Sequence, residues 1–238
     1  MKALLSLFLA ACASIHAADT LQLTLGPGFT PAQQAVCARV QALYGEKLVA
    51  DRGLPAPFSL MGITIRIVPI DGAPPTPNVW AQSYGGTWRG NADGKYVFDG
   101  AGRIDVDSAN LPAWSDEVLG WVLVHEAAHF YAFAGPIWEL NGNMPVVGQY
   151  TGPRALAAYR AEIDPLAAWV PVDESHFAQA LSPMILTPYL SGSYVSMTFL
   201  GVLADNGNEL TKWAANFTGG PLASILPRRS LRPVIVLQ

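Results

Sequence analysis

The chain has 238 residues, with 14 Lys or Arg against 18 Asp or Glu and a formal net charge of −4. This balance excludes the basic footprint on which nucleic-acid binding depends, so no nucleic-acid partner is expected. Hydrophobic residues make up 51% of the chain and charged residues only 13%. Such a composition supports a large core and excludes an intrinsically disordered protein. The two cysteines cannot form a disulfide framework.

The chain begins with the pattern of an export signal. After a positively charged start, residues 3–15 form an apolar stretch that is too short to span a bilayer. Cleavage after Ala17 or Ala18 would release the mature protein. A second interpretation stays open, because residues 9–12 resemble a bacterial lipobox in which Cys12 would carry a lipid anchor. Both interpretations predict a protein that is secreted or held in the cell envelope, and no later stretch predicts a transmembrane span.

The first half of the mature chain predicts a sheet with one helix. Residues 21–25 alternate like a short strand. Thr30 as N-cap and Pro31 at the first helical position predict a helix that runs to about Ala50, with Cys37 as a small buried hydrophobe. Alternating or β-branched patterns predict further strands at residues 63–70, 80–88, 95–99 and 103–107.

The second half predicts helices joined by glycine-rich and irregular segments. Ser115 is a good N-cap for the first of these helices, and Gly135 followed by Pro136 should end it. Irregular chain is expected between the second and third helices. The predicted helices cover residues 116–134, residues 153 to about 165, and residues 194–204.

The helix over residues 116–134 contains an H-E-x-x-H motif formed by His125, Glu126 and His129. At about 100° per residue, the two histidines lie about 40° apart around the helix axis and one turn apart along it, and Glu126 shares their face. Two such imidazoles can bind one zinc ion, and the carboxylate is then placed to accept a proton from water. The flanking residues are apolar on every side, so a metal-free pair would be buried at a cost on the order of several kcal/mol.

Catalytic zinc usually takes three protein ligands, so a third ligand is needed. Outside the export signal, the only further histidine is His176. Spacing alone leaves carboxylates open as alternatives, and Glu162 would complete a pattern of two histidines and one glutamate. The alternative third ligands are Glu139, Glu162, Asp173 and Glu174.

Several further segments match the pattern of a known protein family in their order and spacing. They are residues 21–25, 30–36, 104–111, 135–138, 150–159, 175–177, 186–192 and 203–205. With the H-E-x-x-H motif, they resemble the leishmanolysin-like branch of the metzincin zinc peptidases, in its small secreted bacterial form. The resemblance implies an α/β (α+β), zincin-like domain over residues 19–206. Its N-terminal mixed sheet would pack with two long helices, and its C-terminal subdomain would be mostly irregular. An export signal at 1–18 and an extension of unknown role at 207–238 would flank this domain.

The resemblance also implies the chemistry. His176 becomes the third ligand of a Zn²⁺ ion, Glu126 becomes the general base, and the expected substrates are polypeptides. Zinc would stabilise the oxyanion. Tyr189 and Tyr194 are candidates to assist it, although the favoured interpretation of each is a core or interface aromatic. The strand at residues 103–107 would form the edge of the cleft. Four aspartates that could suggest calcium lack a regular loop pattern and are interpreted as turn and edge residues: Asp93, Asp99, Asp105 and Asp107.

Three positions depart from the family pattern. Ala132 stands where the family has a glycine that allows a sharp turn, which predicts a helix running straight to Gly135. The methionine beneath the metal is matched either by Met184 or, in the better alignment, by Leu186. The glutamate usual just before that methionine turn is also missing.

Two other functions remain as alternatives. One is a non-proteolytic secreted or surface binding protein that keeps the fold and the metal, against which Glu126 argues because simple metal binding needs no such acid. The other is a zinc hydrolase that acts on a non-peptide bond.

Overall fold

A computed structural model of the chain describes residues 20–44, 50–55, 58, 60–71, 79–178, 181, 194–210 and 220–221. The export signal with its lipobox alternative, Met184, Leu186 and Tyr189 lie outside these residues. None of the helices in this part of the chain is long and apolar enough to cross a membrane. The elements are β1 (Thr20–Leu25), α1 (Pro31–Ala42), β2 (Ala50–Asp51), β3 (Leu60–Val68), β4 (Ala81–Tyr84), β5 (Thr87–Gly90), β6 (Tyr96–Asp99), β7 (Ala101–Asp107), the 3-10 helix η2 (Leu111–Ala113), α2 (Asp116–Phe130), α3 (Gly135–Leu140), β8 (Gln149–Tyr150), α4 (Pro153–Glu162), β9 (Val170–Asp173), β10 (His176–Phe177), β11 (Tyr194–Val195), α5 (Met197–Asp205), β12 (Glu209–Leu210) and β13 (Gly220–Pro221).

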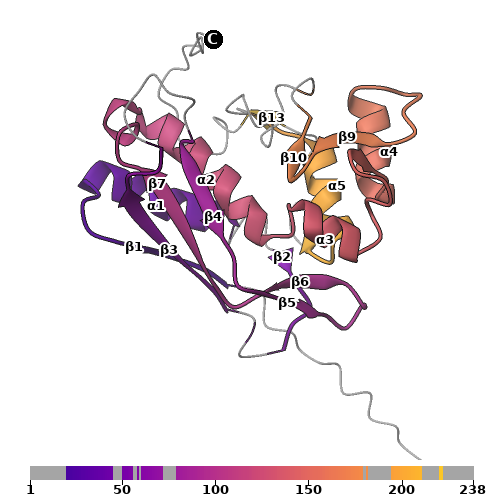
Figure 1. Cartoon of the computed structure of the whole chain (residues 1–238), viewed down its shortest axis with the longest axis horizontal. Coiled ribbons are helices and arrows are strands. Elements are labelled where there is room, and N and C mark those ends of the chain that lie inside the picture. The colour runs from indigo at the N-terminus through magenta and orange to yellow at the C-terminus, as the bar shows by residue number, and fades with distance from the viewer. Residues whose placement is uncertain are drawn as a thin grey trace, which may run out of the picture.

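The main sheet has the strand order β1-β3-β7-β4 (Figure 1). The first three strands are parallel, and β4 pairs antiparallel with β7. In β3, Met61, Ile63 and Ile65 are buried and alternate with more exposed residues, which is the pattern of a strand with one covered face. The predicted mixed α/β fold is therefore confirmed.

The strand at residues 103–107 does not form the cleft edge, so that prediction is wrong. These residues belong to β7, which lies inside the sheet between β3 and β4. One crossover places β3 beside β1, and a second places β7 beside β3. The chain segment between β3 and β7 supplies β4 as the outer strand. Alternation within a strand does not encode its place in the strand order.

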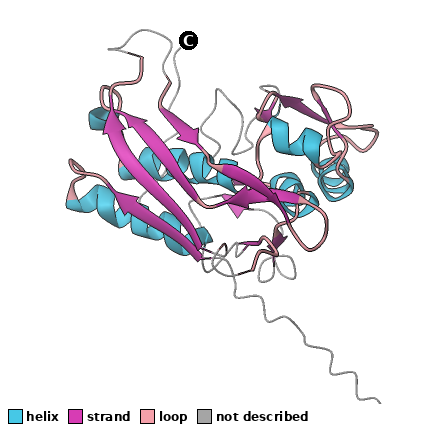
Figure 2. Cartoon of the chain, turned by 60° about the horizontal axis from the view of Figure 1, so that its bottom comes forward, coloured by secondary structure: helices cyan, strands magenta, loops and turns pink. Residues whose placement is uncertain are grey.

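Both long helices lie on one face of the sheet (Figure 2). Thr30 starts α1 as predicted, because its hydroxyl accepts from the amide of Gln33 and the Gln33 side chain accepts from the amide of Thr30. The predicted end near Ala50 is wrong. Residues 50–51 form β2 and pair with β12 from the far end of the described chain, a tertiary contact that overrides local helix propensity. Cys37 is buried as expected, and burial raises the pKa of its thiol to about 11.

Ser115 caps α2 as predicted, since its hydroxyl accepts from the amide of Val118. The predicted end of this helix at residue 134 is wrong, because α2 ends at Phe130. Ala132 takes the left-handed conformation with φ 67°, and the amide of Phe133 donates to the carbonyl of Ala128. This is the hydrogen-bond pattern of a Schellman helix end, in which the left-handed position is usually glycine.

The chain after α2 is more regular than predicted, because β8, β9 and β10 form a small antiparallel sheet beside α3, α4 and α5. Helices α4 and α5 cap each other. At the end of α4, Glu162 accepts from the amides of Met197 and Thr198 at the start of α5. At the end of α5, Asp205 accepts from the amides of Arg154 and Ala155 at the start of α4. These reciprocal caps satisfy amides that have no partner within their own helices.

Candidate metal centre

Three histidines from two distant parts of the chain lie together in the structure. His125 and His129 come from α2, and His176 comes from β10. Their ring centroids form a nearly regular triangle with sides of 5.2, 5.1 and 5.1 Å. One nitrogen atom from each ring can be chosen so that all three atoms lie within 4.8 Å of one another. The structure thus brings together the three histidines that the sequence predicts as metal ligands.

The turn between β9 and β10 delivers His176 to this cluster. Glu174 in that turn has φ 45°, and the hydroxyl of Ser175 accepts from the amide of Gly135 at the start of α3. A Cβ atom at Gly135 would lie 2.3 Å from the carbonyl oxygen of Glu174. Only glycine therefore allows the turn to approach α3 so closely. Gly135, predicted as a helix stop, instead starts α3 and helps to place His176.

His129 is oriented by the chain that leaves α2. Its Nδ1 lies 2.6 Å from the carbonyl oxygen of Phe133. A carbonyl oxygen can only accept, so Nδ1 carries the proton and Nε2 keeps a free lone pair. A carbonyl partner of this kind usually fixes the tautomer and the orientation of a metal-binding histidine. The turn at Ala132 therefore helps to orient His129, because it brings the Phe133 carbonyl back to the imidazole ring.

The chemistry of the three side chains fits a zinc ion. Burial, and then the neighbouring His129 and His125, lower the pKa of His176 to about 3, so its imidazole is neutral at physiological pH and free to bind metal. Two ligands of a tetrahedral zinc ion with Zn–N bonds of 2.0–2.1 Å lie about 3.3–3.4 Å apart.

Glu126 lies beside the cluster and is only 7% exposed. Burial raises the pKa of its carboxyl group, and both His129 and a hydrogen bond from Ser83 oppose this effect. The hydroxyl of Ser83 lies 2.6 Å from Oε2 of Glu126. Sequence analysis missed Ser83, and no local signal marks it, because the contact joins residues 43 positions apart.

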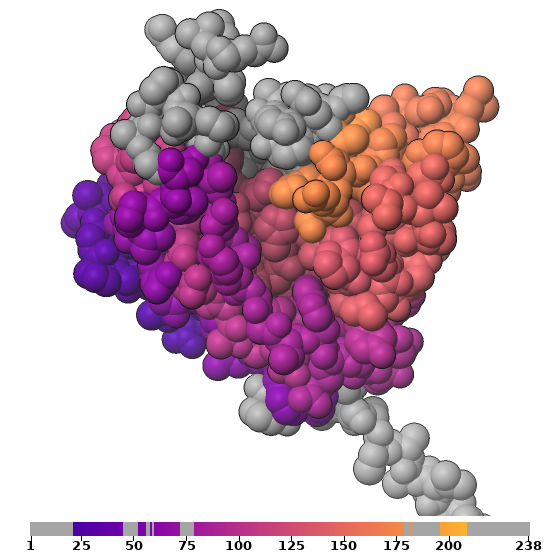
Figure 3. All heavy atoms as spheres, viewed as in Figure 1, coloured from indigo at the N-terminus to yellow at the C-terminus, as the bar shows by residue number. Residues whose placement is uncertain are grey.

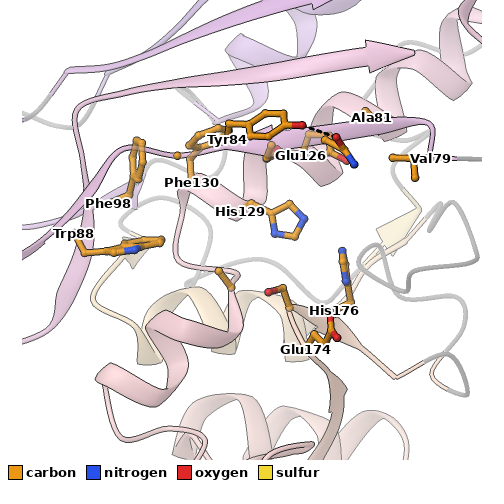
Figure 4. Close-up of a pocket in the computed structure, with 15 residues that line it drawn as sticks. Val79, Ala81, Tyr84, Trp88, Phe98, Glu126, His129, Phe130, Glu174 and His176 are labelled. Carbon is orange, nitrogen blue, oxygen red and sulfur yellow. Dashed lines mark hydrogen bonds between the residues drawn. The ribbon is translucent and has the colours of Figure 1, made fainter. Parts of the chain in front are cut away.

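An open cleft with a volume of about 740 Å³ runs past these residues. Figure 3 shows it as a hollow between the magenta strands of the sheet and the orange segment that contains β9 and β10. Strand β4 forms one wall, the β9–β10 turn forms the other, and α2 contributes Glu126, His129 and Phe130. In Figure 4, His129 and His176 point toward each other across the cleft.

The carboxylates considered as third ligands lie outside the cluster. Glu162 caps α5, while Glu139, Asp173 and Glu174 are exposed. Among the described residues, the three histidines form the only group of metal-binding side chains that could hold one ion. Asp105 pairs with two arginines. Its interpretation as a turn or edge residue is wrong, because it is buried on the interior strand β7. The side chain of Tyr194 is not described.

The left-handed conformation of Ala132 gives a stability prediction. An L-residue in this conformation costs about 1–2 kcal/mol, whereas glycine adopts it readily but loses about 0.5–1 kcal/mol of chain entropy on folding. We expect Ala132→Gly to raise the free energy of unfolding by up to about 1 kcal/mol, as measured by urea denaturation. Ala134→Gly is the control, because Ala134 has an extended φ of −154° and should lose stability. Equal losses in both variants would contradict the account of this turn.

No protein-family model matches this chain, and comparison with curated proteins finds no significant match. The resemblance to leishmanolysin-like peptidases therefore stays a prediction that depends on the motifs in the sequence.

Proposed function

We propose that this chain is an exported, zinc-dependent endopeptidase with a zincin-like fold related to the leishmanolysin-like metzincins. His125, His129 and His176 would hold the zinc ion, and Glu126 would act as general base. The observation that carries the proposal is the convergence of these three imidazoles, from α2 and β10, beside a nearly buried carboxylate in an open cleft. Export is proposed from the first 18 residues of the sequence alone.

The proposed reaction is the hydrolysis of a peptide bond. A zinc ion held by His125, His129 and His176 would supply Lewis-acid chemistry, lowering the pKa of a bound water molecule toward about 7 and polarising a carbonyl group. Glu126 accepts the proton of the attacking water and passes it to the leaving amine. Ser83 holds the carboxylate through its 2.6 Å hydrogen bond, which keeps Oε2 fixed at the cleft wall.

Strand β4 supports a peptide as the substrate. It is the last strand of the main sheet, and no described strand pairs with its outer edge. An extended peptide can add to such an edge through main-chain hydrogen bonds. Residues 81–84 also line the cleft that contains Glu126 and His129. A peptide paired with β4 would therefore carry its backbone past the proposed base and ligands.

Metal removal tests this function. The purified chain should cleave an unstructured protein such as reduced casein, and dialysis against 1,10-phenanthroline should lower the rate at least about 100-fold. One equivalent of Zn²⁺ should then restore cleavage, while Mg²⁺ should not, because Mg²⁺ prefers oxygen ligands. Chelator-resistant cleavage would contradict the proposal. A zinc-loaded chain that cleaves no protein or peptide would instead favour the non-proteolytic binding protein.

A further inference from the structure

The cleft has two chemically different ends along β4. Val79 and Ala81 lie at one end, and Trp88 and Phe98 lie at the other, with Glu126 and His129 between them (Figure 4). The first end offers small aliphatic side chains. The second end is aromatic and is completed by Tyr84 and Phe130, as well as Gly85 and Ala134. None of the described residues that line this aromatic end carries a charge.

The aromatic end is held rigidly by ring contacts. Trp88 packs edge-on against Phe98 with centroids 5.7 Å apart, and Phe98 packs edge-on against Phe130 with centroids 5.0 Å apart. Phe130 follows His129 directly on α2. Phe98 and Phe130 are buried, whereas Trp88 is half-buried and faces the cleft. A fixed aromatic surface of this kind binds an apolar group with little loss of side-chain entropy.

Tyr84 ends β4 and is 43% exposed. The guanidinium of Arg103 lies 4.2 Å from the centroid of its ring, and its hydroxyl bonds the side chain of Gln82. These contacts hold the ring against the outer sheet surface. Because the side chain of Ser83 reaches Glu126 on α2, the side chain of Tyr84 lies on the opposite face of β4. The recess between β4 and the β5–β6 hairpin is therefore lined by Gly85, Trp88, Phe98 and Phe130, none of which carries a charge.

The direction of β4 relates this recess to the scissile bond. β4 runs from Ala81 toward Tyr84 and the recess. Antiparallel pairing is slightly more stable than parallel pairing, so a bound peptide should run in the opposite direction, from the recess toward Ala81. Residues on the amino side of the scissile bond would then lie at the aromatic end.

We infer that the recess formed by Trp88, Phe98 and Phe130 is a specificity subsite for a bulky apolar side chain of the substrate, within three residues on the amino side of the scissile bond. This inference depends on the proposed endopeptidase function and specifies its substrate class. A charged side chain would lose its hydration there without gaining a partner. An aromatic or large aliphatic side chain would bury apolar surface against Trp88.

Cleavage-site mapping of the full chain on blocked peptide libraries tests the subsite. Phe, Tyr or Leu at one of the three positions before the scissile bond should raise kcat/KM about 10- to 100-fold over Ser at the same position. No preference at those three positions would overturn the subsite. A preference that appears only after the scissile bond would also overturn it, because the peptide would then run parallel to β4.

Two tryptophan variants test whether the recess causes the preference for an apolar side chain. Trp88→Ala should reduce the ratio of kcat/KM between the Phe and Ser peptides at least about fivefold. Trp169→Ala is the matched control, because Trp169 is 41% exposed and lies outside the cleft lining. If Trp88→Ala does not fold, Trp88→Leu keeps an apolar contact with Phe98 and should show a smaller loss in the same direction. An unchanged ratio in a folded Trp88 variant would overturn the assignment.

Peptide binding separates failure of the subsite from failure of the function. Calorimetric titration of the Glu126→Gln chain with the two peptides should show tighter binding of the Phe peptide by about 10-fold or more. If wild type cleaves neither peptide but this preference is present and is lost in Trp88→Ala, the subsite stands and the endopeptidase function fails. Equal affinity for both peptides overturns the subsite, whatever the outcome for cleavage.

Discussion

Replacing Glu126 with Gln should lower kcat about 1,000-fold while leaving the zinc content unchanged. Glutamine has nearly the same shape and can still accept the hydrogen bond from Ser83, but it cannot accept a proton from water at neutral pH. General base catalysis contributes about 10²- to 10⁴-fold to enzymatic rates. Among the described residues that line the cleft, the only other carboxylate is the exposed Glu174. The measurement is steady-state hydrolysis of a fluorogenic peptide, with metal analysis of the same sample.

Glu174→Gln is the matched control for this variant. Glu174 also lines the cleft, but it is exposed and lies on the opposite wall, in the β9–β10 turn. Its replacement by an amide should change kcat less than about threefold, since an exposed carboxylate interacts weakly with its surroundings. Comparable losses in both variants would contradict the role of Glu126, and so would a Glu126→Gln protein that keeps full activity.

Replacing His176 with Ala should weaken zinc binding by about 100- to 1,000-fold. Structural zinc sites with four ligands bind with about 10–16 kcal/mol in total, so each ligand contributes about 2.5–4 kcal/mol. Part of this loss is recovered when water takes the vacant position. Competition with a chromophoric chelator measures the affinity. Circular dichroism should show unchanged secondary structure, because His176 is half-buried at the end of the short strand β10.

The control for His176 is its strand partner. Asp173 is opposite His176 in the β9–β10 register but is exposed and is not part of the histidine cluster. Asp173→Ala should therefore bind zinc with nearly the wild-type affinity. If His176→Ala retained wild-type zinc affinity, the ligand would have to be another side chain, and the proposed centre would be wrong.

Local sequence patterns predicted much of the fold. Thr30 and Ser115 mark helix starts because an N-cap hydroxyl satisfies an amide only two or three residues away. Residues 21–25 and 103–107 were predicted as strands from their alternation, and they belong to β1 and β7. Each of these signals operates within one element, so no knowledge of the tertiary structure was needed.

The errors in the fold prediction come from contacts between distant elements. The first helix was extended to Ala50 because β12, the strand that pairs with residues 50–51, lies more than 150 positions further on. Helix α2 was extended to residue 134 because alanine rarely takes the left-handed conformation that Ala132 adopts. The carbonyl of Ala132 accepts from the indole of Trp138, a contact formed by the following helix. The order of strands in the sheet was likewise invisible in the alternation of any one strand.

The candidate site likewise combines residues that local spacing predicts with contacts that only the tertiary structure creates. His125, Glu126 and His129 were found from helical spacing alone, because one helix turn places them together. The approach of His176 depends on the β9–β10 turn and on Gly135, and it was predicted only through the family resemblance. The supporting contacts from Ser83 and from the Phe133 carbonyl were not predicted at all. Such contacts depend on the packing of β4 and on the chain that follows α2.

Anomalous diffraction at the zinc absorption edge tests the metal centre most directly. Crystals of the chain purified with zinc should show one strong anomalous peak inside the triangle formed by the rings of His125, His129 and His176. Each ring should place one nitrogen about 2.0–2.1 Å from the peak. A peak elsewhere, or an electron density map in which His176 turns away from the other two rings, would contradict the proposed centre.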